Sequence, residues 1–168
     1  VLSIPLRELM DQPPRNVADG ESIVRVILHP YHFDKKLRLK PQAFESPPGK
    51  DEVSVIRLDF ADATFCKRWG KNRVAVDGVK EYRGLAVVRA DSIRKIESQV
   101  VATPLDDCPA HADIRHGYTR PQQDEPGTPK EIEKLRTRLK DLLKHVTYYP
   151  DPDVSADDWT GGAVSASI

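Results

Sequence analysis

The sequence lacks the features that most directly indicate a function. No apolar run approaches the roughly 20 residues that a membrane span requires. The nine glycines contain neither the GxGxxG nor the GxxxxGK spacing, which disfavours nucleotide binding through those phosphate loops. Cysteine is scarce, with Cys66 and Cys108 alone, and no secretory hydrophobic segment is visible. We therefore expect a cytoplasmic protein with free thiols, not anchored in a membrane.

Net charge is also absent, because 26 Lys and Arg balance 26 Asp and Glu. No chain-wide field draws in nucleic acid or an anionic membrane, so any nucleic-acid binding requires a local basic patch. The 168 residues, 39% of them hydrophobic, suit one domain with its own core. The 14 prolines predict a larger share of loop than usual.

Strand and helix patterns are interleaved along the chain. Runs of β-branched and apolar residues predict strands. Apolar residues at helical spacing after Asp62, and after Asp91 or Ser92, predict helices. The expected strands are 22–28, 51–60, 83–90, 99–105 and 110–118, with a short edge strand at 35–40, and the expected helices are 61–73 and 92–98. This order predicts an α+β fold: a single domain with a mixed sheet and a few helices.

The boundaries follow from composition. We expect an N-terminal arm, a core domain, a linker, an amphipathic helix and a disordered tail rich in Asp, Ser and Gly. These segments are 1–19, 20–118, 119–127, 128–146 and 147–168.

The helix at 128–146 carries the clearest local signals. Thr128, Pro129 and Glu131 form a capping-box pattern. Apolar residues then recur at helical spacing: Ile132, Leu135, Leu139, Leu142, Leu143 and Val146. The apolar face either docks on the core or binds a partner protein, and the polar hinge at 121–127 favours the partner. The sequence thus predicts an accessory or protein-interaction module.

Two pairs of metal-ligand residues are spaced three apart. His29 and His32 flank a proline and a tyrosine, and Cys108 and His111 flank a proline and an alanine. Thiolate and imidazole are ligands that zinc prefers, so His29, His32, Cys108 and His111 form a candidate zinc site. The structural alternative is that each proline merely begins a loop, and we expect no bound metal or other cofactor.

Catalysis has its own candidates. His111 and Asp113 share one face of a predicted strand, so the carboxylate can orient the imidazole as a general base, with His29 as a further catalytic residue. A Cys108 and histidine pair is another possible nucleophile system. The alternative reading of His111 and Asp113 is a polar pair at the end of a strand.

A basic stretch offers a nucleic-acid hypothesis. Between residues 67 and 95, nine Lys and Arg face three Asp and Glu, with Trp69 and Tyr82 among them. Cations with aromatics suit single-stranded nucleic acid, and the candidate residues are Lys67, Arg68, Trp69, Lys71 and Arg73. The alternative is a solvated surface balanced by the acidic tail.

A wider frame links these segments. The chain resembles a group of short uncharacterised bacterial proteins. The residues that carry this resemblance are, in order, Arg25 with His29-Pro30, Ala43-Phe44, Ser54-Val55 and Pro109-Ala-His111-Ala-Asp-Ile114. The resemblance covers residues 22–116. It implies a bacterial cytosolic protein with His29 and His111 in one compact domain, and it implies no activity.

A fainter likeness concerns enzymes. The strand that begins near Val24, followed by Gln42-Ala43-Phe44, resembles the opening of small NAD-consuming enzymes such as ADP-ribosyltransferase-like toxins. The chain departs from their pattern in its aromatic and late glutamate positions, where Asp113 and Glu125 are the nearest acids. A small hydrolase or NAD-consuming enzyme therefore remains an alternative to the interaction module, as does a nucleic-acid-binding module.

Overall fold

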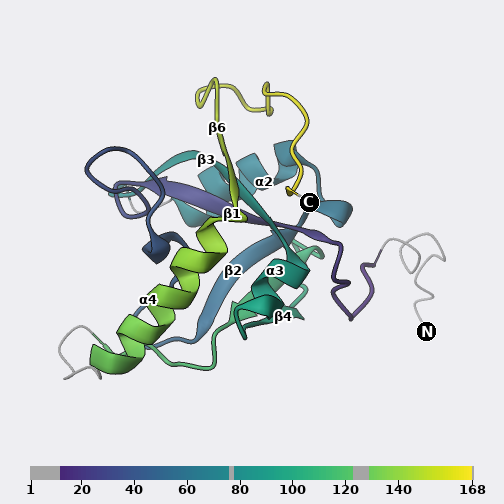
Figure 1. The fold of residues 1–168 in the computed structure, drawn as a ribbon. Helices are drawn as coiled ribbons and strands as arrows, with labels where there is room; N and C mark the ends of the chain where they lie inside the picture. The colour runs from purple at the N-terminus through teal and green to yellow at the C-terminus, as the bar shows by residue number, and fades with distance from the viewer. Residues whose placement is uncertain (1–11, 76–77, 123–128, 168) are drawn as a thin grey trace.

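In the computed structural model, residues 12–75, 78–122 and 129–167 are described. Within them, six strands form one open sheet in the order β4-β5-β2-β1-β3-β6, and every neighbouring pair is antiparallel (Figure 1). The strands are β1 (Ser22–His29), β2 (Glu52–Arg57), β3 (Glu81–Arg89), β4 (Gln99–Ala102), β5 (His111–Arg115) and β6 (Thr147–Pro150). The predicted single-domain α+β class is confirmed, but the sheet is antiparallel and not mixed. The segment 35–40 is a loop whose only strand-like contact is the bridge between Phe33 and Leu39.

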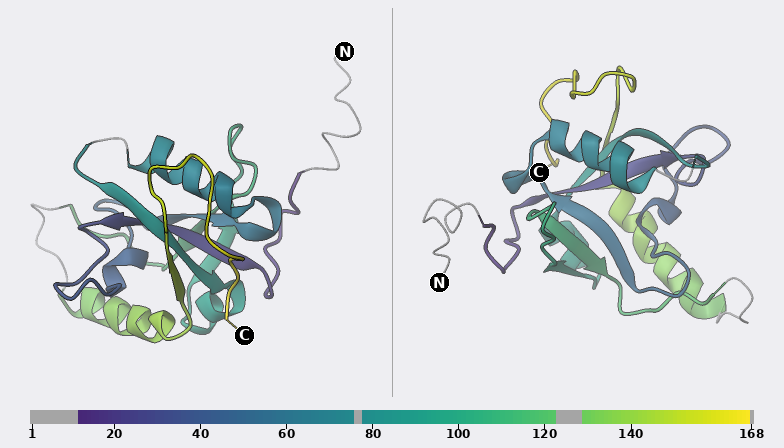
Figure 2. Two further views of the ribbon diagram at one scale, coloured as in Figure 1. Left: turned by 90° about the horizontal axis from the view of Figure 1, so that it is seen from above. Right: turned by 180° about the vertical axis from the view of Figure 1, so that it is seen from behind.

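Two layers of helix and loop cover the sheet. In β1, Ile23 and Ile27 belong to one hydrophobic cluster, and Val24 and Val26 to another, because successive side chains of a strand point to opposite faces. The first cluster is covered by the 3-10 turn η1 (Pro41–Phe44), α3 (Ala90–Lys95) and α4 (Pro129–Leu143), and the second by α2 (Ala63–Trp69). Figure 2 shows α2 and α4 on opposite sides of the sheet.

Helix α2 begins as predicted, at Asp62, whose Oδ1 accepts a hydrogen bond of 2.8 Å from the amide of Phe65. Its α-helical part ends at Trp69, immediately before Gly70 and within the predicted bounds 61–73. The chain continues as a π-helical turn, η3 (Gly70–Val74). A Cβ on Gly70 would lie 2.6 Å from Cγ1 of Val26. This glycine, at the C-cap position of α2, therefore allows close packing of the helix on β1.

Helix α4 is part of the core. Leu135, Leu139 and Leu142 are at most 2% exposed and pack in the first cluster. The apolar face on which the partner prediction rested is thus covered by the protein's own sheet. Thr128, the predicted N-cap, lies outside the described residues. None of the helices in the described part of the chain has the length and hydrophobicity needed to cross a bilayer.

The C-terminal segment is ordered where the sequence predicted a disordered tail. Thr147–Pro150 pairs with β3 as β6. The following residues, which we call the C-terminal tail (151–167), fold back over the second cluster, where Val154, Trp159 and Val164 pack. Apolar residues spaced among Asp and Gly were enough to dock this segment, although its composition is typical of disorder.

The predicted N-terminal arm is also partly packed. Arg57 is 1% exposed; its guanidinium pairs with Glu21 at 2.8 Å and donates to the carbonyl oxygens of Pro14 and Asn16. Val17 joins the first cluster. Segments on both sides of the predicted core boundaries at 20 and 118 therefore share one core.

Candidate functional site

A cleft opens where β1 and β2 separate. These strands pair only at Ile23 with Arg57 and Val24 with Ile56, whereas β1 pairs with β3 along its whole length. The right-hand view of Figure 2 shows β1 and β2 running apart from that point. The gap continues as a cleft of about 1140 Å³. We call it the β1–β2 cleft.

Arg25 projects from β1 into this cleft. Its Nε donates to the carbonyl oxygen of Ala43 at 2.9 Å, and its Nη1 donates to the carbonyl oxygen of Ser54 in β2 at 3.0 Å. The guanidinium has no carboxylate partner among the described residues, and burial lowers its pKa to about 10. Backbone carbonyls thus hold this guanidinium in place, and the described part of the chain supplies no counter-ion for its charge.

Arg25 is not among the functional residues expected from the sequence. A signal was available, because a charged side chain in the middle of the apolar strand 22–28 must either leave the core or meet a partner. What the sequence could not provide was the separation of β1 from β2, which turns that position into a cleft.

His32 lies beside Arg25 in the lining. Its Nδ1 accepts a hydrogen bond of 3.0 Å from the amide of Leu28. Burial, together with the nearby charges of Arg25, Lys80 and Lys40, lowers its pKa to about 3. The ring is therefore neutral at physiological pH, and we assign its proton to Nε2, because Nδ1 is the acceptor. His32 adds an uncharged donor to the cleft.

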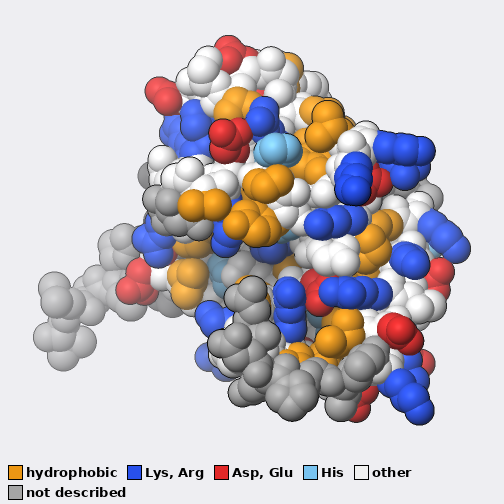
Figure 3. All heavy atoms as spheres, turned by 90° about the vertical axis from the view of Figure 1, so that its left-hand side faces the viewer, with side chains coloured by type: hydrophobic (Ala, Val, Ile, Leu, Met, Phe, Trp, Pro, Cys, Tyr) orange, Lys and Arg blue, Asp and Glu red, His pale blue; other side chains and the backbone are white. Residues whose placement is uncertain are grey.

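The cleft is richer in cations than in acids. Its basic residues are Arg25, Lys40, Lys50, Arg73, Lys80 and Arg120, and its acidic residues are Glu45, Glu52 and Asp113. Glu45 is already engaged, at 3.3 Å from Arg136 and 3.6 Å from Arg120. Figure 3 looks onto this side of the molecule, where Lys and Arg side chains are spread among hydrophobic ones.

Aromatic rings accompany these cations. Tyr31 is 47% exposed, and the ammonium of Lys80 lies 5.5 Å from its ring centre. Trp69 also lines the cleft, stacked against Phe65 and covered by the guanidinium of Arg73 at 5.1 Å. Planar rings beside cations can hold a planar, negatively charged ligand.

His111 and Asp113 both line the cleft. They lie two apart on β5, so they share a face, as the catalytic hypothesis required. Nδ1 of His111 is 2.8 Å from Oγ1 and 3.0 Å from the carbonyl oxygen of Thr103. His29, the third catalytic candidate, is not in the lining; it is half-buried at the end of β1, with its ring centre 6.0 Å from that of Phe33.

The four candidate zinc ligands are not gathered around one point. Within 12–75, 78–122 and 129–167, no group of three or more His, Cys, Asp or Glu is placed to hold a metal ion. Cys108 is fully buried, and desolvation raises its thiol pKa to about 11. Cys66 is buried on α2, with its pKa also raised by desolvation. Such thiols are poor nucleophiles.

His116, the remaining buried histidine, has a structural position. Its Nδ1 is 2.7 Å from Oγ of Ser98, and its Nε2 is 2.7 Å from the carbonyl oxygen of Phe44. Both ring nitrogens are therefore used to join η1 to the segment before β4.

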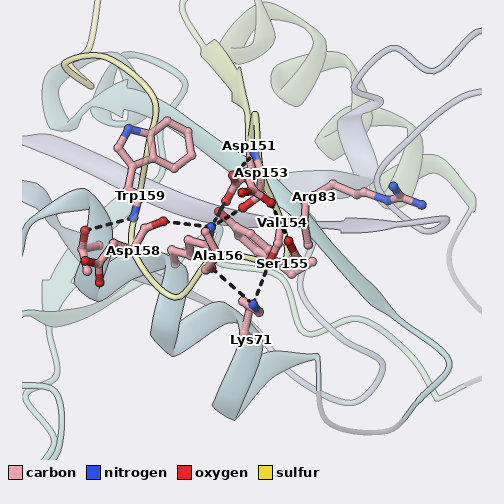
Figure 4. A network of polar contacts seen from close by, with 12 residues as sticks. Lys71, Arg83, Asp151, Asp153, Val154, Ser155, Ala156, Asp158 and Trp159 are labelled. Atoms are coloured by element: carbon pink, nitrogen blue, oxygen red, sulfur yellow. Dashed lines mark hydrogen bonds and ion pairs between the residues drawn. The ribbon is translucent and has the colours of Figure 1, made fainter.

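The basic stretch divides into two parts. Lys67, Arg68 and Lys71 hold the C-terminal tail: Lys67 pairs with Asp151, Arg68 pairs with Asp158, and Lys71 donates to the carbonyl oxygen of Val154. Figure 4 shows Lys71 beneath the backbone of Val154 and Ala156. Only Trp69 and Arg73 of the five predicted nucleic-acid residues line the cleft.

Comparison of the chain with protein-family models, with curated proteins and with solved structures found no match.

Proposed function

We propose that the protein binds single-stranded nucleic acid in the β1–β2 cleft. The observation that carries this proposal is Arg25, a guanidinium held by two carbonyl oxygens and without a carboxylate partner among the described residues. A partly buried cation is costly unless an anion meets it. A phosphate group supplies that anion, and the planar guanidinium can bind it through two hydrogen bonds.

The rest of the cleft supports a polymer of nucleotides. Lysines such as Lys40 and Lys50 lie along it, so more than one phosphate can be neutralised. Tyr31, which is 47% exposed, offers a ring to a base. A cleft that is open to solvent and basic along its length suits a flexible single strand.

The other predicted functions have weaker support. The apolar face of α4, which motivated a partner protein, is buried in the core. A cysteine-dependent enzyme would need an accessible thiolate, and both thiols are buried with raised pKa.

A second candidate is a protein partner at the mouth of the cleft. Tyr31, Val79 and Leu105 line it and are 47%, 62% and 41% exposed. Large exposed apolar side chains that gather around a cleft mark interaction sites. The basic lining of the cleft favours an acidic polypeptide as this partner. An acidic polypeptide therefore serves as a competitor in the binding experiment described next.

The test is fluorescence anisotropy with a short labelled oligouridine, at about 50 and about 200 mM NaCl. We expect saturable binding that weakens steeply with salt. Arg25→Met should weaken it most. Because that side chain also joins β1 to β2, Lys50→Ala serves as the second variant: it is exposed, and we expect a several-fold loss with a salt slope smaller by about one.

The matched control is Lys140→Ala, an exposed lysine on α4 that does not line the cleft. It removes the same charge and should leave binding unchanged. The proposal fails if the wild-type protein does not bind, if Lys50→Ala and Lys140→Ala behave alike, or if polyglutamate displaces the oligonucleotide as well as unlabelled oligouridine does.

A further inference from the structure

Two hydrogen-bond acceptors on β5, His111 and Asp113, line the predominantly basic β1–β2 cleft. The carbonyl oxygen of Thr103 can only accept a hydrogen bond, and it lies 3.0 Å from Nδ1 of His111. We therefore place a proton on Nδ1, and in this tautomer Nε2 is the ring nitrogen whose lone pair can accept a hydrogen bond. His111 is 8% exposed and lines the cleft. Its Nε2 is the nitrogen left for a ligand.

Asp113 is the second acceptor. It is 9% exposed, lines the cleft and lies on the same face of β5 as His111. In the pairing of β5 with β2, Asp113 lies opposite Ser54. The carbonyl oxygen of Ser54 accepts a hydrogen bond from Arg25. Its carboxylate has no hydrogen-bond or ion-pair partner among the described residues. Its oxygens still reach the solvent of the cleft, so a ligand can donate hydrogen bonds to them.

A carboxylate in a cleft for phosphates has a physical consequence. It repels the backbone of the ligand unless a hydrogen-bond donor of the ligand sits against it. The ligand must therefore carry a donor close to its phosphates. In a single strand, the ribose 2′-hydroxyl is such a donor, it recurs at every nucleotide, and DNA lacks it. Amino groups of bases are donors too, but they differ from base to base.

We infer that the strand bound in this cleft is RNA. His111 and Asp113, on the α2 side of the sheet, accept hydrogen bonds from a ribose 2′-hydroxyl, while Arg25, on the η1 side of the gap between β1 and β2, binds a phosphate of the same strand. This inference rests on the proposed function and adds the sugar that the same site selects.

The test compares three strands of one base sequence: oligouridine, its 2′-O-methyl form and oligodeoxyuridine. The methyl form keeps the ribose oxygen but cannot donate. For the wild-type protein we expect RNA to bind about tenfold more tightly than either of the others, the value of one hydrogen bond to a charged acceptor. In Asp113→Asn this preference should shrink to about twofold.

The matched control is Glu52→Gln. Glu52 also lines the cleft, from the exposed end of β2. Glu52→Gln removes one negative charge, as Asp113→Asn does. It should therefore strengthen the binding of all three strands equally and keep the preference for RNA. His111→Phe, which keeps a ring against Trp69, is the second variant, and we expect it to lose the preference as Asp113→Asn does.

Each contrary result is distinct. Equal binding of RNA and DNA that still depends on Lys50 would overturn the sugar selection and leave the proposed function standing. Tight binding of the 2′-O-methyl strand with weak binding of DNA would overturn the donor role. A preference that follows base sequence and not the sugar would assign the donor to a base. Absence of binding to any strand would defeat both proposals.

Discussion

Lys67 and Asp151 form an ion pair of 3.0 Å in which neither side chain is exposed to solvent. The pair joins α2 to the residue that follows β6, and the hydroxyl of Tyr82 donates to the same carboxylate at 2.8 Å. Lys67 also donates to the carbonyl oxygens of Asp153 and Asp158. Three residues of the C-terminal tail thus surround one buried ammonium group.

Removing one member of this pair should be severely destabilising. In Lys67→Met the carboxylate of Asp151 stays buried without its counter-ion, which we expect to lower the free energy of unfolding by about 3 to 5 kcal/mol. Urea unfolding followed by tryptophan fluorescence measures this. Arg68→Met is the control, because that pair with Asp158 is exposed, and its stability should stay close to that of the wild type. Equal effects of the two variants would contradict the buried role of Lys67.

Acidification should destabilise the protein before its carboxylates titrate. Desolvation lowers the pKa of His32 to about 3 and also lowers that of His116. Because the unfolded chain binds these protons near pH 6.5 and the folded chain does not, the stabilisation is complete above about pH 6.5 and is lost progressively as the pH falls toward 3. Each histidine contributes a slope of up to about 1.4 kcal/mol per pH unit.

Urea unfolding between pH 7 and pH 5 measures this slope. His32→Asn keeps an acceptor for the amide of Leu28 but does not titrate, so we expect its stability to depend less on pH than that of the wild type. An unchanged slope in this variant would assign the effect to other groups.

The two thiols should be inert in the folded protein. Cys66 and Cys108 are fully buried, and desolvation raises the pKa of both. A thiol-disulfide reagent at pH 8 should label neither cysteine until a denaturant is added, and both should then react. Rapid labelling of Cys108 in the native state would reopen the cysteine-dependent enzyme as an alternative.

The core role of α4 predicts a large cost for truncating its apolar face. Leu139 is 0% exposed, so Leu139→Ala should lower the free energy of unfolding by about 2 to 5 kcal/mol through lost burial and a cavity. Lys140→Ala, the adjacent exposed position, should change stability little. A stable Leu139→Ala monomer would contradict the packing of this helix on the sheet.

Local signals in the sequence predicted much of the fold. The β-branched run at 22–28 predicted β1, and Asp62 predicted the start of α2. The helical spacing of Leu135, Leu139 and Leu142 predicted the apolar face of α4. These features depend on neighbours in the chain, which is why they can be read from it.

The features that failed depend on contacts between distant segments. The basic residues Lys67 and Lys71 looked like a ligand surface, because their true partners lie 83 to 91 positions later in the sequence. The tail has a composition typical of disorder, and the sequence does not show that Trp159 and Val154 pack in the second cluster with residues of α2 and the sheet, far away in the chain. Likewise, His111 and Asp113 could be placed on one face of a strand, but the cleft that they line depends on how far β1 stands from β2.

The buried ammonium of Lys67 also constrains the order of folding. A ribosome makes α2 long before it makes the tail, and the carbonyl oxygen of Asp153 that binds Lys67 comes 86 positions later. Until then, the sheet lacks its edge strand β6, the tail does not yet pack on the second cluster beside α2, and the ammonium of Lys67 lacks its partners from the tail. Contacts of such sequence separation form late and slowly. The nascent chain is therefore most exposed to aggregation and to proteases in the interval before residues 147–167 emerge.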